Sequence, residues 1–206
     1  MSAAELIPLE RPGTTARTAV ALHATGGDEQ QLAGLALDLL PGAHLLAPRG
    51  QVMEGGHTRR FFARRSMMDL DIEDLTARAD DLGAALEARM TAAGRDPARA
   101  VAVGYSNGAN IAIGMLFGRP ALLGAAVLLR PMLPYTPEPL PDLSGLRLFV
   151  AAGEQDPYGG VEATEALLSV LRGAGAEVTL HMAPVGHELT QDDLEAARAF
   201  VATLDD

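Results

Sequence analysis

Short apolar runs recur along the chain, and stretches of helical character separate most of them. The runs occupy residues 18–23, 44–47, 100–105, 124–129, 146–152 and 178–182. Strands that alternate with helices form a mostly parallel sheet, and helices then cover both faces of that sheet. Such strands are buried on both sides, so they should be apolar almost throughout, as AVAVGY and GAAVLL are. The alternation predicts an α/β fold.

The stretches between the runs carry the spacing of amphipathic helices. Residues 71–94 place apolar side chains at steps of three and four, with charged residues on the other face. Residues 161–175 and 190–204 repeat this pattern. The last of these segments opens with Thr190 and Asp193, three positions apart, which is close to a capping box.

Length and composition favour one domain that spans residues 1–206. With 206 residues, of which 48% are hydrophobic, the chain has enough apolar surface for one sizeable core. No apolar run reaches the roughly 18 residues of a membrane helix. The start, MSAAELIPLERPG, lacks the basic region and the apolar run of a signal peptide. We therefore expect a cytoplasmic protein that does not insert into membranes.

The composition also excludes several kinds of chemistry. Without cysteine there is no thiolate nucleophile or thiolate metal ligand. All 16 basic residues are arginine, so the chain has no lysine for a Schiff base or for a phosphate-binding P-loop. A net charge of −11 repels phosphate backbones, and we therefore expect no nucleic-acid partner.

One serine stands where a buried strand must turn into a helix. Ser106 lies between Gly104 and Gly108 in VAVGYSNGANIAIG, with the G-x-S-x-G spacing of a nucleophile elbow. A sharp turn exposes the middle side chain, and the helix that starts there directs backbone N–H groups toward developing negative charge. The composition gives only ~0.06 chance matches to this spacing. The pattern predicts a serine nucleophile, and the alternative is a serine that only caps the helix.

A serine hydroxyl needs a base, and in this type of site an acid and then a histidine follow the serine along the chain. Asp156 comes just past a predicted strand in LFVAAGEQDPYGG, and His187 follows the last predicted strand in LHMAPVGHELT. We expect His187 to act as general base and acid, and Asp156 to hold its tautomer, without any metal or cofactor. His57 is the alternative base, and Glu154 and Asp142 are the alternative acids.

The segment ALHATGGDEQQL, which follows the first of the six runs, is a candidate oxyanion loop. Its adjacent glycines free the backbone to turn an N–H group inward. We expect the backbone N–H groups of Thr25 and Asn107 to bind the oxyanion. The alternative is a plain turn that Asp28 caps.

The long connection after the second run carries five arginines and the adjacent Phe61 and Phe62. Long loops on a compact sheet are usually functional or disordered. We expect Phe61 and Phe62 to form an apolar wall near the serine, with His23, Arg60 and Tyr158 as further residues of the substrate pocket. The arginines could attract an anionic substrate or pair with the surplus carboxylates, and one phenylalanine could fill the core instead.

Four stretches, LHATGGDE, APRGQVMEGGHTRRFFAR, GYSNGAN and VGHELT, together resemble the phospholipase/carboxylesterase family of α/β-hydrolases. The branch that the chain most resembles holds small bacterial carboxylesterases related to acyl-protein thioesterases, some of them associated with the response to hydroquinone-type compounds. The resemblance covers nearly the whole chain. It implies an α/β-hydrolase fold without a large lid, a triad of Ser106, Asp156 and His187, and hydrolysis through an acyl-enzyme, often in a dimer. Ala24 departs from the family, which commonly has glycine there, and its methyl group could narrow the oxyanion loop.

We therefore expect a serine carboxylesterase whose partner is a small-molecule ester. A thioesterase, a lysophospholipase or a dienelactone-type lactonase on the same scaffold is the alternative among enzymes. A binding protein of this fold that has lost catalysis is the alternative of another class, although such proteins usually lack one member of the triad.

Overall fold

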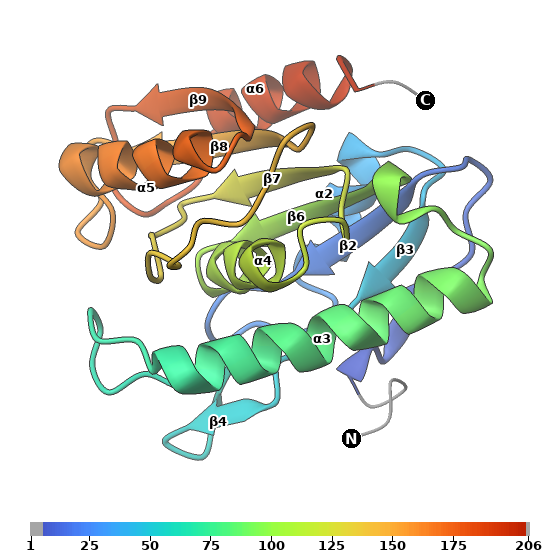
Figure 1. Ribbon diagram of the computed structural model, residues 1–206, viewed down its shortest axis with the longest axis horizontal. Coiled ribbons are helices and arrows are strands. Elements are labelled where there is room, and N and C mark those ends of the chain that lie inside the picture. The colour runs from blue at the N-terminus through green and yellow to red at the C-terminus, as the bar shows by residue number, and fades with distance from the viewer. Residues whose placement is uncertain (1–5, 205–206) are drawn as a thin grey trace.

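The computed structural model describes residues 6–204, so the first five residues of the stretch used for the signal-peptide expectation lie outside the described residues. Its centre is a seven-stranded sheet with the strand order β1-β3-β2-β6-β7-β8-β9 (Figure 1). Of these strands, β1 pairs antiparallel with β3 and the others run parallel to one another. The bounds are β1 (Leu9–Arg11), β2 (Thr18–Leu22), β3 (His44–Ala47), β6 (Ala100–Tyr105), β7 (Ala125–Leu129), β8 (Arg147–Gly153) and β9 (Glu177–Ala183).

The six predicted strands are all present, and they form the parallel part of the sheet. Strand β1 was not predicted because its three residues, Leu-Glu-Arg, carry no apolar run. It joins the sheet through backbone pairing with β3. An edge strand that is partly solvated does not need the apolar sequence by which buried strands are recognised.

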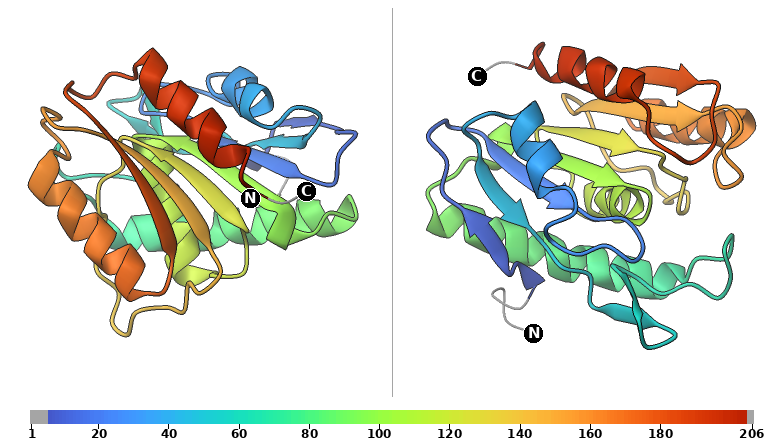
Figure 2. Two further views of the ribbon diagram at one scale, coloured as in Figure 1. Left: turned by 90° about the horizontal axis from the view of Figure 1, so that it is seen from above. Right: turned by 180° about the vertical axis from the view of Figure 1, so that it is seen from behind.

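Helices cover both faces of the sheet, as the sequence predicted (Figure 2). Helices α3 (Ile72–Ala92), α4 (Asn107–Gly118) and α5 (Val161–Gly173) lie on one face, and α2 (Ala33–Leu39) and α6 (Gln191–Val201) lie on the other. Thr190 and Asp193 form the predicted capping box at the start of α6. Among residues 6–204, none of the helices is both long enough and apolar enough to cross a lipid bilayer.

Successive residues of the central strands point into two different cores. In β2, Val20 and Leu22 belong to the core under α3, α4 and α5, whereas Ala19 and Ala21 belong to the core under α2 and α6. All four side chains are at most 1% exposed. Burial on both faces explains why these strands read as continuous apolar runs, and it fixes the register of the sheet edge that carries the site.

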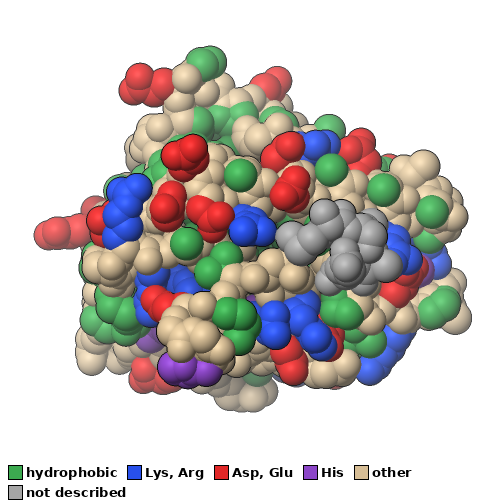
Figure 3. Space-filling model, turned by 90° about the horizontal axis from the view of Figure 1, so that it is seen from below, with side chains coloured by type: hydrophobic (Ala, Val, Ile, Leu, Met, Phe, Trp, Pro, Cys, Tyr) green, Lys and Arg blue, Asp and Glu red, His purple; other side chains and the backbone are tan. Residues whose placement is uncertain are grey.

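The arginine-rich connection contains a two-stranded hairpin that the sequence did not predict. Strand β4 (Val52–Glu54) pairs antiparallel with β5 (Thr58–Arg60), apart from the main sheet and beside α3 (Figure 1). Figure 3 shows the face formed by α3 and this hairpin, on which arginine and acidic side chains are interspersed. The other long connection, residues 130–146, joins β7 to β8 without a helix or strand.

Candidate active site

The backbone turns sharply at Ser106, between β6 and α4. Its φ angle is 52°, in the left-handed region that residues other than glycine rarely adopt. The N–H of Ser106 donates a 2.8 Å hydrogen bond to the carbonyl of Leu129, which ties the turn to β7. A Cβ at Gly104 would lie 2.6 Å from the carbonyl oxygen of Gly108, and a Cβ at Gly108 would collide with the backbone of Leu22. Close packing therefore requires both glycines.

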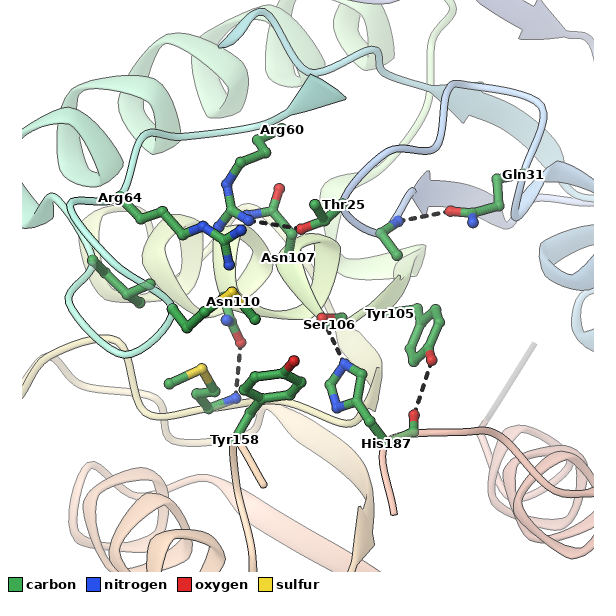
Figure 4. Close-up of a pocket in the computed structure, with 14 residues that line it drawn as sticks. Thr25, Gln31, Arg60, Arg64, Tyr105, Ser106, Asn107, Asn110, Tyr158 and His187 are labelled. Carbon is green, nitrogen blue, oxygen red and sulfur yellow. Dashed lines mark hydrogen bonds between the residues drawn. The ribbon is translucent and has the colours of Figure 1, made fainter. Parts of the chain in front are cut away.

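Asp156 and His187 complete a chain of hydrogen bonds that begins at Ser106. The imidazole Nε2 of His187 lies 2.8 Å from the Oγ of Ser106 (Figure 4), and its Nδ1 lies 2.7 Å from the Oδ2 of Asp156. A carboxylate only accepts hydrogen bonds, so Nδ1 carries the proton and Nε2 is free to accept the serine proton. The other oxygen of Asp156 accepts the backbone N–H of Tyr158 at 2.9 Å. The structure thus brings the three predicted residues together.

Two tyrosines flank the imidazole of His187. The hydroxyl of Tyr105 donates a 2.9 Å hydrogen bond to the carbonyl oxygen of His187, and burial raises the pKa of Tyr105, so this hydroxyl stays protonated. The ring of Tyr158 meets the imidazole edge-on, with 4.9 Å between the ring centroids. Tyr158 lines the cavity, as the sequence analysis expected of it. Tyr105 was not predicted, because only the folded turn shows that its hydroxyl reaches the histidine loop.

Thr25 and Asn107 both line the cavity beside Ser106 (Figure 4). Neither backbone N–H donates a hydrogen bond to any residue in the described range, 6–204. The loop around Thr25 is fixed by its neighbours, because the N–H of Ala24 donates to Oε1 of Gln31 at 2.8 Å. Ala24 is not among the residues with a positive φ, so its methyl group fits the loop without backbone strain.

The alternative residues lie away from Ser106. His57 is exposed on the turn between β4 and β5, Glu154 is exposed, and the carboxylate of Asp142 accepts a hydrogen bond within its own turn. Asp28 accepts a hydrogen bond from the N–H of Gln30 in a turn that precedes α2, so it does not cap that helix. Within residues 6–204, no group of three or more His, Asp and Glu side chains could hold a metal ion.

Ser106 opens onto a cavity of about 330 Å³. Its lining is mixed and includes hydroxyl, amide, guanidinium and imidazole groups as well as alanine, leucine and methionine side chains. The lining residues are Ala24, Thr25, Gln31, Arg60, Arg64, Met67, Leu70, Tyr105, Ser106, Asn107, Asn110, Met132, Tyr158 and His187. One signal in the sequence could have identified Asn110: it is an amide within an apolar helix, four residues after Ser106, and so lies on the same helix face.

The prediction was wrong for three of the pocket residues, because their side chains are buried in the core instead. His23, Phe61 and Phe62 are at most 4% exposed, and none of them lines the cavity. The ring of Phe61 stacks on the imidazole of His23 with centroids 4.4 Å apart. Burial lowers the pKa of His23, and its Nε2 accepts the N–H of Gly50 at 2.9 Å, so the ring is neutral. The two phenylalanines are buried in the core, where they lose more contact with water than they would at an open, partly polar cavity.

Arg60 was predicted as a pocket residue, and it lines the cavity together with Arg64. Arg64 is paired with Glu54 at 2.7 Å. Arg60 donates instead to the hydroxyl of Thr25 at 2.8 Å and to the carbonyl of Phe62 at 3.2 Å, and no carboxylate among residues 6–204 forms an ion pair with it. Burial, together with the nearby charge of Arg64, lowers the pKa of Arg60 to about 10, so its guanidinium remains charged at neutral pH.

The remaining arginines of the same connection bind partners on the protein. Arg49 is paired with Glu29, and Arg65 lies 3.9 Å from the carboxylate of Asp69. Arg59 donates to the carbonyl of Gly50 at 2.8 Å. Pairing with surplus carboxylates therefore accounts for part of the arginine cluster, and the cavity accounts for Arg60.

Comparison with known proteins places this geometry among hydrolases. The model of the dienelactone hydrolase family matches residues 49–203. A curated protein of Bacillus subtilis (strain 168), "Putative hydrolase MhqD", is 40% identical over 186 residues, which cover 90% of this chain and 92% of that protein.

Solved structures share the fold. The crystal structure of the Bacillus cereus carboxylesterase matches with a TM-score of 0.90 and 37% identity, over 94% of this chain and 92% of that one. A protein of unknown function from Agrobacterium tumefaciens str. C58 matches with a TM-score of 0.90 and 34% identity, over 98% of both chains. The central sheet and its helices have the α/β-hydrolase fold, as the sequence resemblance implied.

Proposed function

The chain belongs to the dienelactone hydrolase family, and from that premise we propose that it is a serine carboxylesterase that hydrolyses small esters. The observation that carries the proposal is the hydrogen-bond chain from Ser106 through His187 to Asp156 at the wall of a cavity. The similarity to the Bacillus cereus carboxylesterase supports the choice of esters as the substrate class.

In the first half of the proposed reaction, the Oγ of Ser106 attacks the ester carbonyl carbon while its proton passes to Nε2 of His187. The carboxylate of Asp156 stabilises the imidazolium that forms. The carbonyl oxygen becomes an oxyanion, for which the backbone N–H groups of Thr25 and Asn107 are the candidate donors. The tetrahedral intermediate then collapses, and the alcohol leaves with the proton from Nε2.

In the second half, water takes the place of the alcohol. It gives a proton to Nε2 of His187 and attacks the acyl carbon on Ser106, and the same backbone donors stabilise the second oxyanion. Release of the carboxylic acid returns the proton from Nε2 to Oγ. The balance of atoms requires only the ester and one water molecule.

The size and lining of the cavity favour small substrates that carry a polar or negatively charged group. Its volume of about 330 Å³ lies at the small end of ligand pockets. The guanidinium of Arg60 lines the cavity and has no carboxylate partner among the described residues. An acceptor on the substrate would pair with it.

Lactones are a second candidate substrate class. The family model that matches the chain is that of dienelactone hydrolases, and a lactone is a cyclic ester that the same nucleophile opens. A comparison of kcat/KM for aryl acetates, small lactones and acyl thioesters would rank these classes.

The proposal is tested by removing the nucleophile. We expect Ser106→Ala to lower ester hydrolysis by about four orders of magnitude or more. Ser169→Ala, which changes an exposed serine of α5, is the matched control and should keep full activity. A fluorophosphonate probe should label the wild type at Ser106 alone. Near-native hydrolysis by the Ser106→Ala variant, or a wild type that the probe does not label, would contradict a serine mechanism.

A further inference from the structure

Arg130 occupies an unusual position directly after β7. Its φ angle is 51°, and Ser106 and Arg130 are the two residues other than glycine with a positive φ among residues 6–204. They follow the neighbouring strands β6 and β7. Such conformations are unfavourable for residues with a side chain and persist only where surrounding contacts enforce them, which is common at functional sites. Here the contact partners of the Arg130 side chain show what that conformation achieves.

The guanidinium of Arg130 binds the segment that immediately follows His187. Its Nε and Nη2 donate hydrogen bonds of 3.1 and 2.7 Å to the carbonyl oxygen of Glu188. Its Nη1 and Nη2 donate bonds of 3.1 and 2.6 Å to the two carboxylate oxygens of Asp193. The side chains of Arg130 and Asp193 are both 0% exposed, so this is a fully buried, bidentate ion pair.

Asp193 links the same pair to the start of α6. Its Oδ2 also accepts the backbone N–H of Thr190 at 2.7 Å and the hydroxyl of Thr190 at 2.8 Å. Burial raises the pKa of Asp193, but the hydrogen bonds from Arg130 and Thr190 together outweigh it and hold the pKa below its ordinary value. The carboxylate is therefore ionised, and it orients the guanidinium toward Glu188.

Together with Tyr105, Arg130 fixes the backbone of His187 and of the residue that follows it. The carbonyl of Glu188 is bound by Arg130, and the carbonyl of His187 is bound by Tyr105 at 2.9 Å. The carbonyl groups of two successive residues are thus held, one by the residue that follows β7 and the other by the last residue of β6. Buried ion pairs can often be replaced by apolar residues without loss of stability, so packing alone does not require a charged residue at this place.

We propose that Arg130 is a positioning residue, which holds the peptide after His187 so that Nε2 stays directed at the Oγ of Ser106. The inference depends on the proposed serine mechanism. Arg130 itself does not line the cavity and acts only through the histidine loop. Its function depends on the planar fork of arginine, which binds a carboxylate and a carbonyl at the same time.

The sharpest variant is Arg130→Lys, because lysine keeps a cation for Asp193 but cannot make both pairs of hydrogen bonds. We expect kcat for p-nitrophenyl acetate to fall about 10- to 100-fold, with KM within about threefold of the wild type, since a loop that is slightly displaced mainly affects the chemical step. Arg130→Met removes the charge altogether and should lower kcat at least as much. The matched control is Phe200→Leu, which makes a cavity in the core near the C-terminal end of α6, where the ring packs against Phe149, and should lower Tm while leaving the hydrogen bonds of Arg130 in place.

Proton NMR of the histidine Nδ1–H separates positioning from general instability. The wild type and Phe200→Leu should both show a far-downfield resonance from the hydrogen bond between His187 and Asp156, whereas Arg130→Lys should show it broadened or lost. If Arg130→Lys keeps the resonance and its kcat falls no further than that of Phe200→Leu, Arg130 is only structural and the inference is wrong. A wild type without esterase activity would instead refute the proposed function, and the resonance would still report on the histidine. If Arg130→Met does not fold, Arg130→Lys and the isosteric Asp193→Asn carry the comparison.

Discussion

The hydroxyl of Tyr105 donates a 2.9 Å hydrogen bond to the carbonyl oxygen of His187, so the residue before the serine also holds the backbone of the histidine. Since Tyr105 ends β6 and Ser106 begins the turn, a single strand end positions both partners of the proposed proton transfer. The distance of 2.8 Å between Oγ and Nε2 thus depends on contacts outside the triad.

Tyr105→Phe tests that dependence. Loss of one hydrogen bond should reduce the free energy of unfolding by about 1 kcal/mol. We expect kcat to fall several-fold with little change in KM, because the imidazole loses one of its constraints. Tyr135→Phe is the matched control, since its ring is also partly buried but its hydroxyl makes no hydrogen bond within residues 6–204. Steady-state kinetics and urea unfolding of both variants provide the comparison, and equal kinetic effects would contradict the assignment.

Asp156→Asn should abolish most of the activity and leave the fold intact. An amide no longer stabilises the imidazolium, and it can present its N–H to Nδ1, which favours the wrong tautomer. We expect kcat to fall by about 10⁴ by analogy with other triads. Glu154→Gln, at an exposed acid two residues away, should remain near wild type. A large loss in Glu154→Gln together with a small loss in Asp156→Asn would reverse the assignment of the acid.

Arg60→Gln tests the preference for charged substrates. We expect kcat/KM for monoethyl succinate to fall about tenfold or more, and that for ethyl butyrate to change by less than about threefold, because only the former offers a carboxylate to the guanidinium. A pH-stat follows both reactions. Arg65→Gln, in the same connection but outside the cavity lining, should leave the ratio unchanged. If kcat/KM fell equally for both esters, the role of Arg60 would instead be to hold Thr25 in place through its hydrogen bond to the threonine hydroxyl.

The burial of His23 makes stability depend on pH. Burial lowers the pKa of His23 below its ordinary value of 6.5, so below that pH the unfolded chain binds a proton that the folded protein does not. This contribution to stability is complete above pH 6.5 and is lost as the pH falls toward the lowered pKa, with a slope of at most about 1.4 kcal/mol per pH unit. His23→Gln should flatten urea-unfolding stability between pH 6.5 and 5. The control His57→Gln, at an exposed position, should keep the wild-type slope.

Gly108→Ala tests the close packing of α4 on β2. The added Cβ would collide with the backbone of Leu22 and lie 2.7 Å from the carbonyl oxygen of His23, so strand and helix must separate. We expect a loss of stability of about 3 kcal/mol or more. Gly118→Ala, at the end of the same helix with nothing within 4 Å of its Cβ, should be neutral or slightly stabilising. Thermal unfolding of both variants measures the difference.

The parallel strands and the turn at Ser106 could be predicted from the sequence because each has a local signature, and Asp156 and His187 could be predicted because they follow strands that end at the same edge of the sheet. Strands buried on both faces are apolar throughout, and Gly104, Ser106 and Gly108 meet the steric demands of one turn. The direction of side chains in a connection has no such signature. Phe61 and Phe62 follow an unpredicted hairpin, and their burial depends on how that hairpin packs on the core. Strand β1 was not predicted for a related reason, since backbone pairing with β3 and the contacts of Glu10 with His44 and Arg89 hold it in place and none of these leaves an apolar run in the sequence.

The side chains and the backbone of the β4–β5 hairpin make different contributions to the site. The side chain of Arg60 reaches the cavity, while the backbone of the hairpin and of the residue after it is bonded to both sides of the serine. The carbonyl of Arg59 accepts the N–H of Gly26 in the loop after β2, and the N–H of Phe61 donates to the side chain of Asn107 at the start of α4, both at 2.8 Å. Under the proposed function, substitutions on this hairpin can therefore alter which esters the cavity accepts. Insertions or deletions would shift the anchoring bonds and disturb the reaction itself, so the length of the hairpin should vary less than its sequence.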